Sequence, residues 1–170
     1  MVGVAISREQ EIEYVKIALE QITAIGWSAQ NAGRHDRSLN FFEYVAQYAG
    51  SIAAEMAVQS YFGEVNIESI REHKFKNKAD IGSHIEVKWA GWKDSGLWIQ
   101  PYDRDGDTAV LVVGKSPTLY LVGWIPVVAA KVNRHANKSQ SNWYVTQNHL
   151  AQMENFKRSN AGKEWENVRG

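Results

Sequence analysis

The sequence predicts a single α/β (α+β) domain in which two helices precede a mostly antiparallel sheet. Apolar residues recur at three- and four-residue steps in two stretches, residues 7–25 and 41–62, which is the period of amphipathic helices. From residue 65 to residue 128 the pattern changes to short alternating runs separated by Gly, Asp and Pro, as expected for strands and turns. A chain of 170 residues is long enough to bury one sizeable core.

The first helix is predicted over residues 7–25. Ser7 followed by Gln10 forms a capping box, and Gly26 suits the end of the helix. The polar segment 28–40 that follows is expected to be a loop.

A longer helix is predicted over residues 41–62, with Gly63 at its end. Its apolar stripe continues at helical steps to Glu55, which places this carboxylate on or beside the buried face. A second face is unusually small, which favours close packing against a sheet; it comprises Ala46, Ala49, Ala53, Ala57 and Ser60.

The remaining elements follow in order along the chain. Strands are expected at residues 85–89, 96–100, 109–113 and 119–124. The acidic segment 103–107 is interpreted as a hairpin turn, because it lacks the glutamate that completes a calcium loop. Short helices are expected around 127–133 and 146–156, and the polar tail 157–170 is expected to fray. The whole chain, 1–170, is predicted to be one domain with its core at about 41–131.

Composition narrows the class of protein. Hydrophobic residues make up 44% and charged residues 22% of the chain, the ordinary balance of a globular domain. No apolar run reaches about 18 residues, so no membrane-spanning segment is expected. The chain has no cysteine, which excludes disulfides and thiolate metal sites and fits a cytoplasmic location.

The segment from Asp80 to Lys88 carries the strongest functional signal. Glu86 and Lys88 are two residues apart on a predicted strand, so their side chains share one face while Val87 points into the core. Carboxylates supply the hard oxygen ligands that Mg²⁺ prefers, and the Val87 carbonyl would complete such a shell. A neighbouring lysine can orient water or stabilise charge during phosphodiester hydrolysis. Taken alone, the pattern favours an exposed strand with a Glu–Lys pair, and its context in the chain is what favours a catalytic site.

The order of these residues resembles a known family. Glu55 on a helix, then Asp80, then Glu86-Val-Lys88 resembles the PD-(D/E)xK, or restriction-endonuclease-like, nuclease superfamily. More narrowly, the chain is similar to small nuclease-like proteins encoded by bacteriophages and related elements. The matching blocks are residues 51–63, 78–89, 97–114 and 120–131.

The resemblance implies a fold and a set of roles. The fold would be an αβββαβ core, a mixed central sheet flanked by helices, here with an extra N-terminal helix. Asp80 and Glu86 would be metal ligands, Lys88 the catalytic lysine and Glu55 an accessory acid. Gln100, on the next strand, would orient water or phosphate. The implied cofactor is Mg²⁺ or Mn²⁺.

The sequence departs from the family pattern in two ways. Ala79 stands where the name of the motif has proline. The gap between Asp80 and Glu86 is short, so the two carboxylates converge only if a tight turn forms, with Gly82-Ser83 as the expected place.

DNA is the expected partner, although the overall charge does not favour nucleic acid. The chain has 19 basic and 19 acidic residues, so contacts to phosphates would need local basic patches. Two such patches are present, and solvated surface is an equal alternative for each; they contain Lys74, Lys76 and Lys78, and Lys131 and Arg134.

We therefore expect a metal-dependent endonuclease or exonuclease that hydrolyses DNA phosphodiester bonds, located in the cytoplasm, that of the host if the chain is phage-encoded. One alternative is a catalytically inactive nuclease-fold module that binds DNA or a protein. Another is a resolvase specific for DNA junctions or branches that acts as a homodimer.

Overall fold

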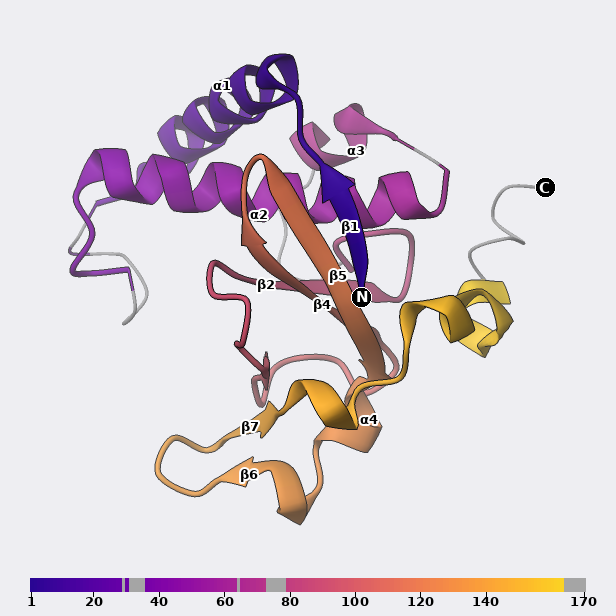
Figure 1. Cartoon of the computed structure of the whole chain (residues 1–170). Coiled ribbons are helices and arrows are strands. Elements are labelled where there is room, and N and C mark those ends of the chain that lie inside the picture. Colours follow the sequence, from indigo (N-terminus) through magenta and orange to yellow (C-terminus); the bar gives the residue numbers. More distant parts are fainter. Residues whose placement is uncertain (29, 31–35, 64, 73–78, 164–170) are drawn as a thin grey trace.

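The computed structural model describes residues 1–28, 30, 36–63, 65–72 and 79–163 (Figure 1). The helices are α1 (Arg8–Ile25), α2 (Phe41–Tyr61), α3 (Ile67–Glu72) and α4 (Val127–Ala130). The strands are β1 (Val2–Ala5), β2 (Ile85–Ala90), β3 (Leu97–Ile99), β4 (Thr108–Lys115), β5 (Thr118–Pro126), β6 (Ala136–Asn137) and β7 (Asn142–Val145). Three 3-10 turns follow α4, at Asn133–His135, Gln147–His149 and Met153–Arg158.

The strands form two sheets. The main sheet has the order β1-β5-β4-β2, and the second has the order β3-β7-β6. Within the main sheet β2 runs parallel to β4, while the β4–β5 and β1–β5 pairs are antiparallel. The predicted mixed sheet with flanking helices is therefore confirmed, and β2 lies at one edge of it. The expected αβββαβ core is seen only in part, because β3 joins the second sheet and α4 is only four residues long.

Both long helices begin where local capping dictates. Ser7 accepts a hydrogen bond from the backbone N–H of Gln10, and the Gln10 side chain accepts one from the backbone N–H of Ser7, which confirms the predicted capping box. Gly26 ends α1 in the left-handed conformation. Asn40 caps α2 in the same reciprocal manner with Glu43. These bonds satisfy backbone groups that a helix end otherwise leaves unpaired.

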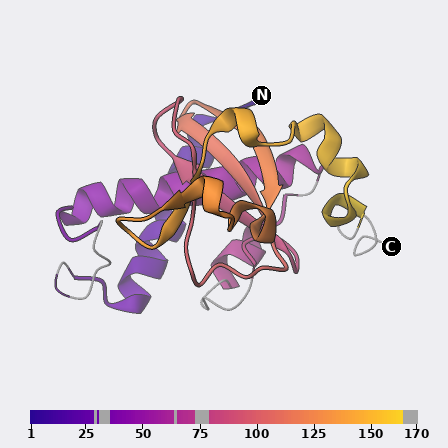
Figure 2. The same ribbon diagram turned by 90° about the horizontal axis from the view of Figure 1, so that it is seen from below.

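The core lies on both sides of β4. Val110 and Val112 pack with α1 and α2, whereas Ala109 and Leu111 pack with β3, β7 and α4. Figures 1 and 2 show the resulting layers, with the two long helices on one side of the main sheet and the β6–β7 hairpin on the other. A strand buried on both faces reads as a continuous apolar run, and the sequence of β4 has that character.

Helix α2 approaches β2 closely because its facing residues are small. Ala49, Ala53 and Ala57 of the predicted small face are buried, while Ala46 and Ser60 are exposed. Gly50 allows the closest approach: a Cβ atom there would lie 2.5 Å from Cη2 of Trp89. The Trp89 indole N–H donates to the Gly114 carbonyl, so the ring is held in place.

Replacing Gly50 with alanine is therefore expected to destabilise the fold. Overpacking of a core costs about 1–3 kcal/mol, and the better helix propensity of alanine recovers at most about 1 kcal/mol. Three atoms of the Trp89 ring would lie 2.5, 2.8 and 2.9 Å from this Cβ, so the cost should fall in the upper part of that range. We therefore expect a net loss of about 1–2 kcal/mol in the free energy of unfolding, measured by urea denaturation. Gly106→Ala is the matched control, since nothing lies within 4 Å of its Cβ position and its effect should stay within about 0.5 kcal/mol. Equal stability of the Gly50→Ala and wild-type proteins would contradict the close contact.

Several predicted elements are wrong or were missed. Strand β1 and helix α3 were not predicted, and they consist of only four and six residues. The predicted helix over 146–156 is two 3-10 turns instead. The predicted tail is folded as far as Lys163, with Ala161 packed against the core, and residues 164–170 lie outside the described part. Within the described residues, none of the helices combines the length and apolar character needed to cross a membrane.

Candidate active site

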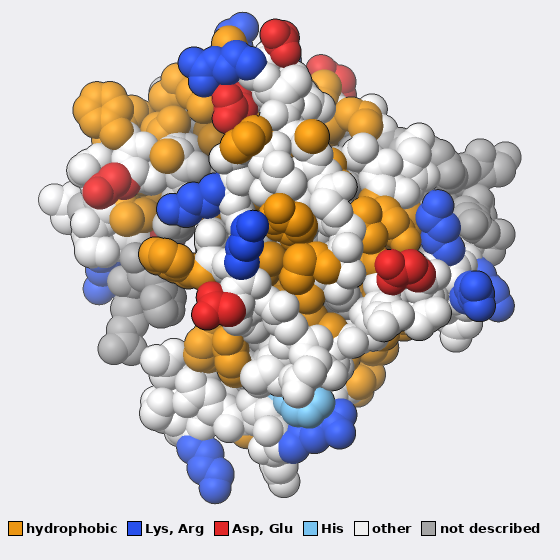
Figure 3. All heavy atoms as spheres, viewed as in Figure 1, with side chains coloured by type: hydrophobic (Ala, Val, Ile, Leu, Met, Phe, Trp, Pro, Cys, Tyr) orange, Lys and Arg blue, Asp and Glu red, His pale blue; other side chains and the backbone are white. Residues whose placement is uncertain are grey.

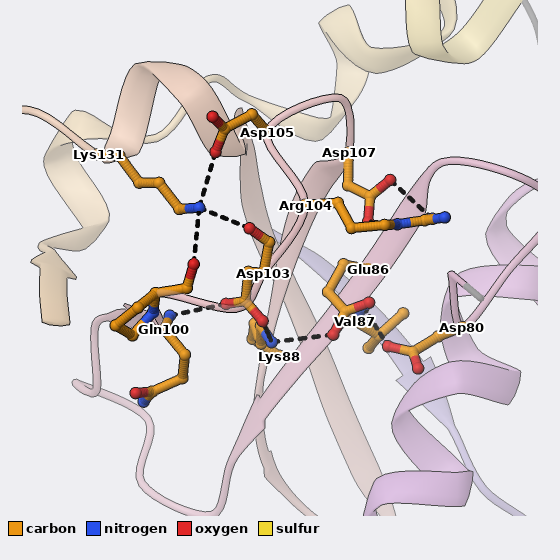
Figure 4. A network of polar contacts seen from close by, with 11 residues as sticks. Asp80, Glu86, Val87, Lys88, Gln100, Asp103, Arg104, Asp105, Asp107 and Lys131 are labelled. Carbon is orange, nitrogen blue, oxygen red and sulfur yellow. Dashed lines mark hydrogen bonds and ion pairs between the residues drawn. The ribbon is translucent and has the colours of Figure 1, made fainter. Parts of the chain in front are cut away.

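A tight turn brings Asp80 back beside the strand that follows it. Ile81 and Ile85 exchange two backbone hydrogen bonds of 3.0 and 3.2 Å, and Gly82 takes a left-handed φ of 59° between them. The turn therefore forms where the sequence predicted it. Its result is that the Asp80 Oδ2 atom accepts a 2.7 Å hydrogen bond from the Val87 N–H (Figure 4).

This hydrogen bond also defines the orientation of the Val87 carbonyl. In a strand, the N–H and C=O of one residue point to the same edge, and the direction alternates along the chain. The His84 carbonyl accepts from the Thr108 N–H of β4, so even-numbered residues face β4. Val87 consequently presents its carbonyl to the outer edge of β2, on the side where Asp80 lies. The expected third oxygen donor thus faces the same edge as Asp80.

Three carboxylates act on one another at this edge. Glu55 comes from α2, on the same face as Val87 and Trp89, while Glu86 lies on the opposite face of β2. Burial, and then the negative charges of Asp80 and Glu86, raise the pKa of Glu55 well above its usual range. Burial raises the pKa of Asp80 to about 7, and the charge of Glu86 adds to the rise. Like charges near one another favour protonation or the binding of a cation.

Lys88 lies between two carboxylates. Its Nζ atom is 2.9 Å from Oε1 of Glu86 and 3.0 Å from Oδ1 of Asp103 (Figure 4). Burial opposes the charged form, but the negative charges and hydrogen bonds of these two partners outweigh burial and raise the pKa of Lys88. The ammonium group is therefore charged and fixed at neutral pH.

The donor set fits a hard divalent cation in a particular way. The described residues include no group of three or more His, Asp or Glu side chains arranged to hold a metal ion. Mg²⁺, however, is usually held by only one or two carboxylates together with water and substrate phosphates. Asp80, Glu86 and the Val87 carbonyl match that pattern, and the repulsion between the carboxylates is what a cation would relieve.

Asp103 contacts Lys88, although the sequence suggested Gln100 as the residue of this segment that belongs to the site. The Gln100 backbone N–H donates to Oδ2 of Asp103 at 2.8 Å, and in Figure 4 the Gln100 amide points away from Lys88. Asp103 was assigned only to a hairpin turn, and that prediction is wrong, because β3 and β4 lie in different sheets and the turn connects them. The Asp103 side chain is 4% exposed and contacts Lys88 directly. A usable signal was the excess of acidic residues immediately after the strand that follows the Glu86–Lys88 pair.

The basic residues expected to bind nucleic acid do not form one surface in the described part of the chain. Lys131 donates to the backbone carbonyls of Pro101 and Asp103 and to the Asp105 carboxylate, so its ammonium group is used within the protein. Arg134 is exposed and donates to the His135 ring. Lys74, Lys76 and Lys78 lie outside the described residues. Figure 3 shows basic side chains scattered among acidic and hydrophobic ones on the face it presents.

An open groove leads to the helix side of this site. It has a volume of about 1170 Å³ and runs between α1, α2 and β2, with Glu55 and Val87 in its wall. Its other charged residues are Arg8, Glu11, Asp36, Glu43 and Lys115. Because acidic side chains outnumber basic ones, the groove by itself does not attract a phosphate backbone.

Fold and site together define a mixed α/β domain with an acidic cluster and a fixed lysine at the edge of its sheet. No protein-family model, no curated protein and no solved structure matches the chain.

Proposed function

We propose that this protein is a metal-dependent deoxyribonuclease that hydrolyses phosphodiester bonds at the outer edge of β2. The observation that carries the proposal is the meeting of Asp80, Glu86 and the charged Lys88 at that edge, beside the Val87 carbonyl. Carboxylates that repel one another in a partly buried position are stabilised by a cation, and a fixed ammonium group complements an anionic substrate. A phosphodiester that binds together with a divalent cation meets both requirements, because the cation neutralises the carboxylates and the phosphate pairs with the ammonium group.

Each residue has a distinct part in this chemistry. Asp80 and Glu86 bind the cation, and the Val87 N–H keeps Asp80 oriented towards it. Bound Mg²⁺ or Mn²⁺ supplies neutralisation of the scissile phosphate and activation of the attacking water. Lys88 stabilises the negative charge that develops on the phosphate. Burial and the charges of Asp80 and Glu86 raise the pKa of Glu55, which favours its protonated form when no cation is present.

We also propose that the domain has a restriction-endonuclease-like core. Helix α2 followed by the strand that carries Glu86 and Lys88, packed on one another, supports a restriction-endonuclease-like core. In this proposal β3, β6 and β7 form an addition on the face opposite α2. The turn that contains Asp103 connects β3 to β4.

Cleavage of a mixed panel of nucleic acids tests the proposed function. Supercoiled, linear, single-stranded and branched DNA, and RNA, are incubated with Mg²⁺, Mn²⁺ or EDTA. We expect cutting of at least one DNA substrate with either metal and none with EDTA. A parallel preparation of Glu86→Ala should not cut, which excludes a contaminating nuclease. Absence of cutting on every substrate, together with no metal binding in calorimetry, would contradict the proposal and favour an inactive binding module.

A dimeric, branch-specific form of the enzyme has one observation in its favour. Large apolar side chains are exposed on α1 and at the start of α2, namely Ile12, Val15, Leu19, Phe41 and Phe42. Figure 3 shows hydrophobic atoms gathered in this region, at the upper left. Exposed apolar patches commonly mark association surfaces. The mass of the protein in solution, measured together with its preference for branched DNA, distinguishes this form from a monomeric nuclease.

A further inference from the structure

Lys88 contacts a second carboxylate, Asp103, in addition to Glu86. Glu86 and Asp103 contact the same ammonium group from two sides, at 2.9 and 3.0 Å. When Glu86 binds a cation, its charge is shared and its hold on Lys88 weakens. Asp103 then remains as the anionic partner that keeps the ammonium group at the same place.

Asp103 is itself held rigidly. Its side chain is 4% exposed, and while Oδ1 accepts from Lys88, Oδ2 accepts from the Gln100 N–H. The Asp103 N–H donates in turn to the Gln100 carbonyl at 3.1 Å. Both carboxylate oxygens and the backbone N–H are therefore used, so the carboxylate has little freedom to follow Lys88 or to release it.

The turn that carries Asp103 is anchored from a distant part of the chain. Lys131, directly after α4, is 15% exposed at its side chain and donates to three acceptors in residues 101–105. Two of these acceptors are the backbone carbonyls of Pro101 and Asp103. A partly buried ammonium group bonded to backbone carbonyls fixes the path of the turn. The charge of Lys131, which was expected to contact DNA, therefore has a structural use.

We propose that Asp103 is a positioning residue that holds the Lys88 ammonium group in its catalytic orientation, with Lys131 fixing the turn from which Asp103 acts. This inference rests on the proposed nuclease function. It predicts that loss of the Asp103 charge impairs the chemical step and leaves the binding of metal and DNA intact.

The variant Asp103→Asn tests the inference, because asparagine keeps one oxygen that can accept from the Gln100 N–H. The charge and the oxygen that accepts from Lys88 are lost, since an NH2 group takes that oxygen's place. We expect kcat to fall about tenfold or more, with KM for DNA and the Mn²⁺ Kd from calorimetry within about threefold of wild type. Asp94→Asn is the control, because Asp94 is an exposed carboxylate in the loop between β2 and β3, outside the Lys88–Asp103–Lys131 contacts. Its kcat should stay within about twofold of wild type.

A double-mutant cycle shows whether Asp103 acts through Lys88. In the Lys88→Ala background, Asp103→Asn should cause no further loss of kcat, since effects of residues in one interaction are not additive. The same four proteins are also compared, without metal, by their unfolding equilibrium constants in urea, where the two substitutions should be coupled by about threefold or more. If Lys88→Ala cuts too slowly for kcat to be measured, this second cycle decides whether Asp103 acts through Lys88. Independent effects in the deciding cycle, or an unchanged kcat in Asp103→Asn, would overturn this assignment alone. A wild-type protein that neither cuts nor binds metal would overturn the proposed function as well.

Discussion

Replacing Asp80 with asparagine is expected to remove both metal binding and DNA cleavage while leaving the fold intact. Asparagine can still accept the hydrogen bond from the Val87 N–H, so the turn that returns the chain to β2 is preserved. What is lost is the charge that binds the cation. Changes to residues that merely orient a metal ligand cost about 10–100-fold in affinity or activity, so loss of a ligand should cost at least about 100-fold.

Calorimetric titration with Mn²⁺ and cleavage of the preferred DNA substrate measure this effect. Asp94→Asn serves as the control, because Asp94 is an exposed carboxylate outside the site. Its metal affinity and cleavage rate should equal those of the wild type. An Asp80→Asn variant that cuts DNA at the wild-type rate would exclude Asp80 as a ligand and remove the basis of the proposed function.

The metal-free protein is expected to lose stability as the pH rises through the range in which Asp80 ionises. The folded protein raises the pKa of Asp80 from 3.8 to about 7, first by burial and then by the charge of Glu86. A carboxyl group with a raised pKa binds its proton more tightly in the folded state than in the unfolded state. Its contribution to stability is therefore complete below pH 3.8 and is lost as the pH rises to about 7. Each pKa unit corresponds to about 1.4 kcal/mol, so the change is at most about 4 kcal/mol.

Urea unfolding in EDTA, compared between wild type and Asp80→Asn from pH 4 to pH 8, isolates this contribution. As the pH rises, the unfolding free energy of the wild type should fall relative to that of Asp80→Asn. Glu55 should contribute to the same trend in the wild type, because burial and the charges of Asp80 and Glu86 raise its pKa too. Adding Mn²⁺ at pH 8 should restore stability to the wild type and not to the variant, since a ligand that binds the folded state stabilises it. A pH-independent difference would show that the fold does not raise the pKa of Asp80.

The sequence alone was sufficient for features that depend on a few neighbouring residues. The capping box at Ser7 and Gln10 and the turn at Gly82 were predicted from residue types at fixed spacing, and the structure confirms them. The alternation that separates Glu86 and Lys88 from Val87 was predicted in the same way, because side chains of a strand alternate between its faces. These signals are local, so they are complete within one turn of helix or one strand.

The tertiary structure alone decided the pairings between distant segments. Lys88 and Asp103 are 15 residues apart, and Lys131 and Asp103 are 28 residues apart, so no local period indicates that they meet. The parallel pairing of β2 with β4, and the departure of β3 into the second sheet, bring the turn at residues 101–105 over Lys88. Strand pairing is determined by which faces the whole chain can bury together, and the sequence specifies that outcome only through the sum of all its contacts. For this reason the Glu86–Lys88 pair could be predicted from the sequence, whereas the contacts of Asp103 with Lys88 and of Lys131 with the turn could not.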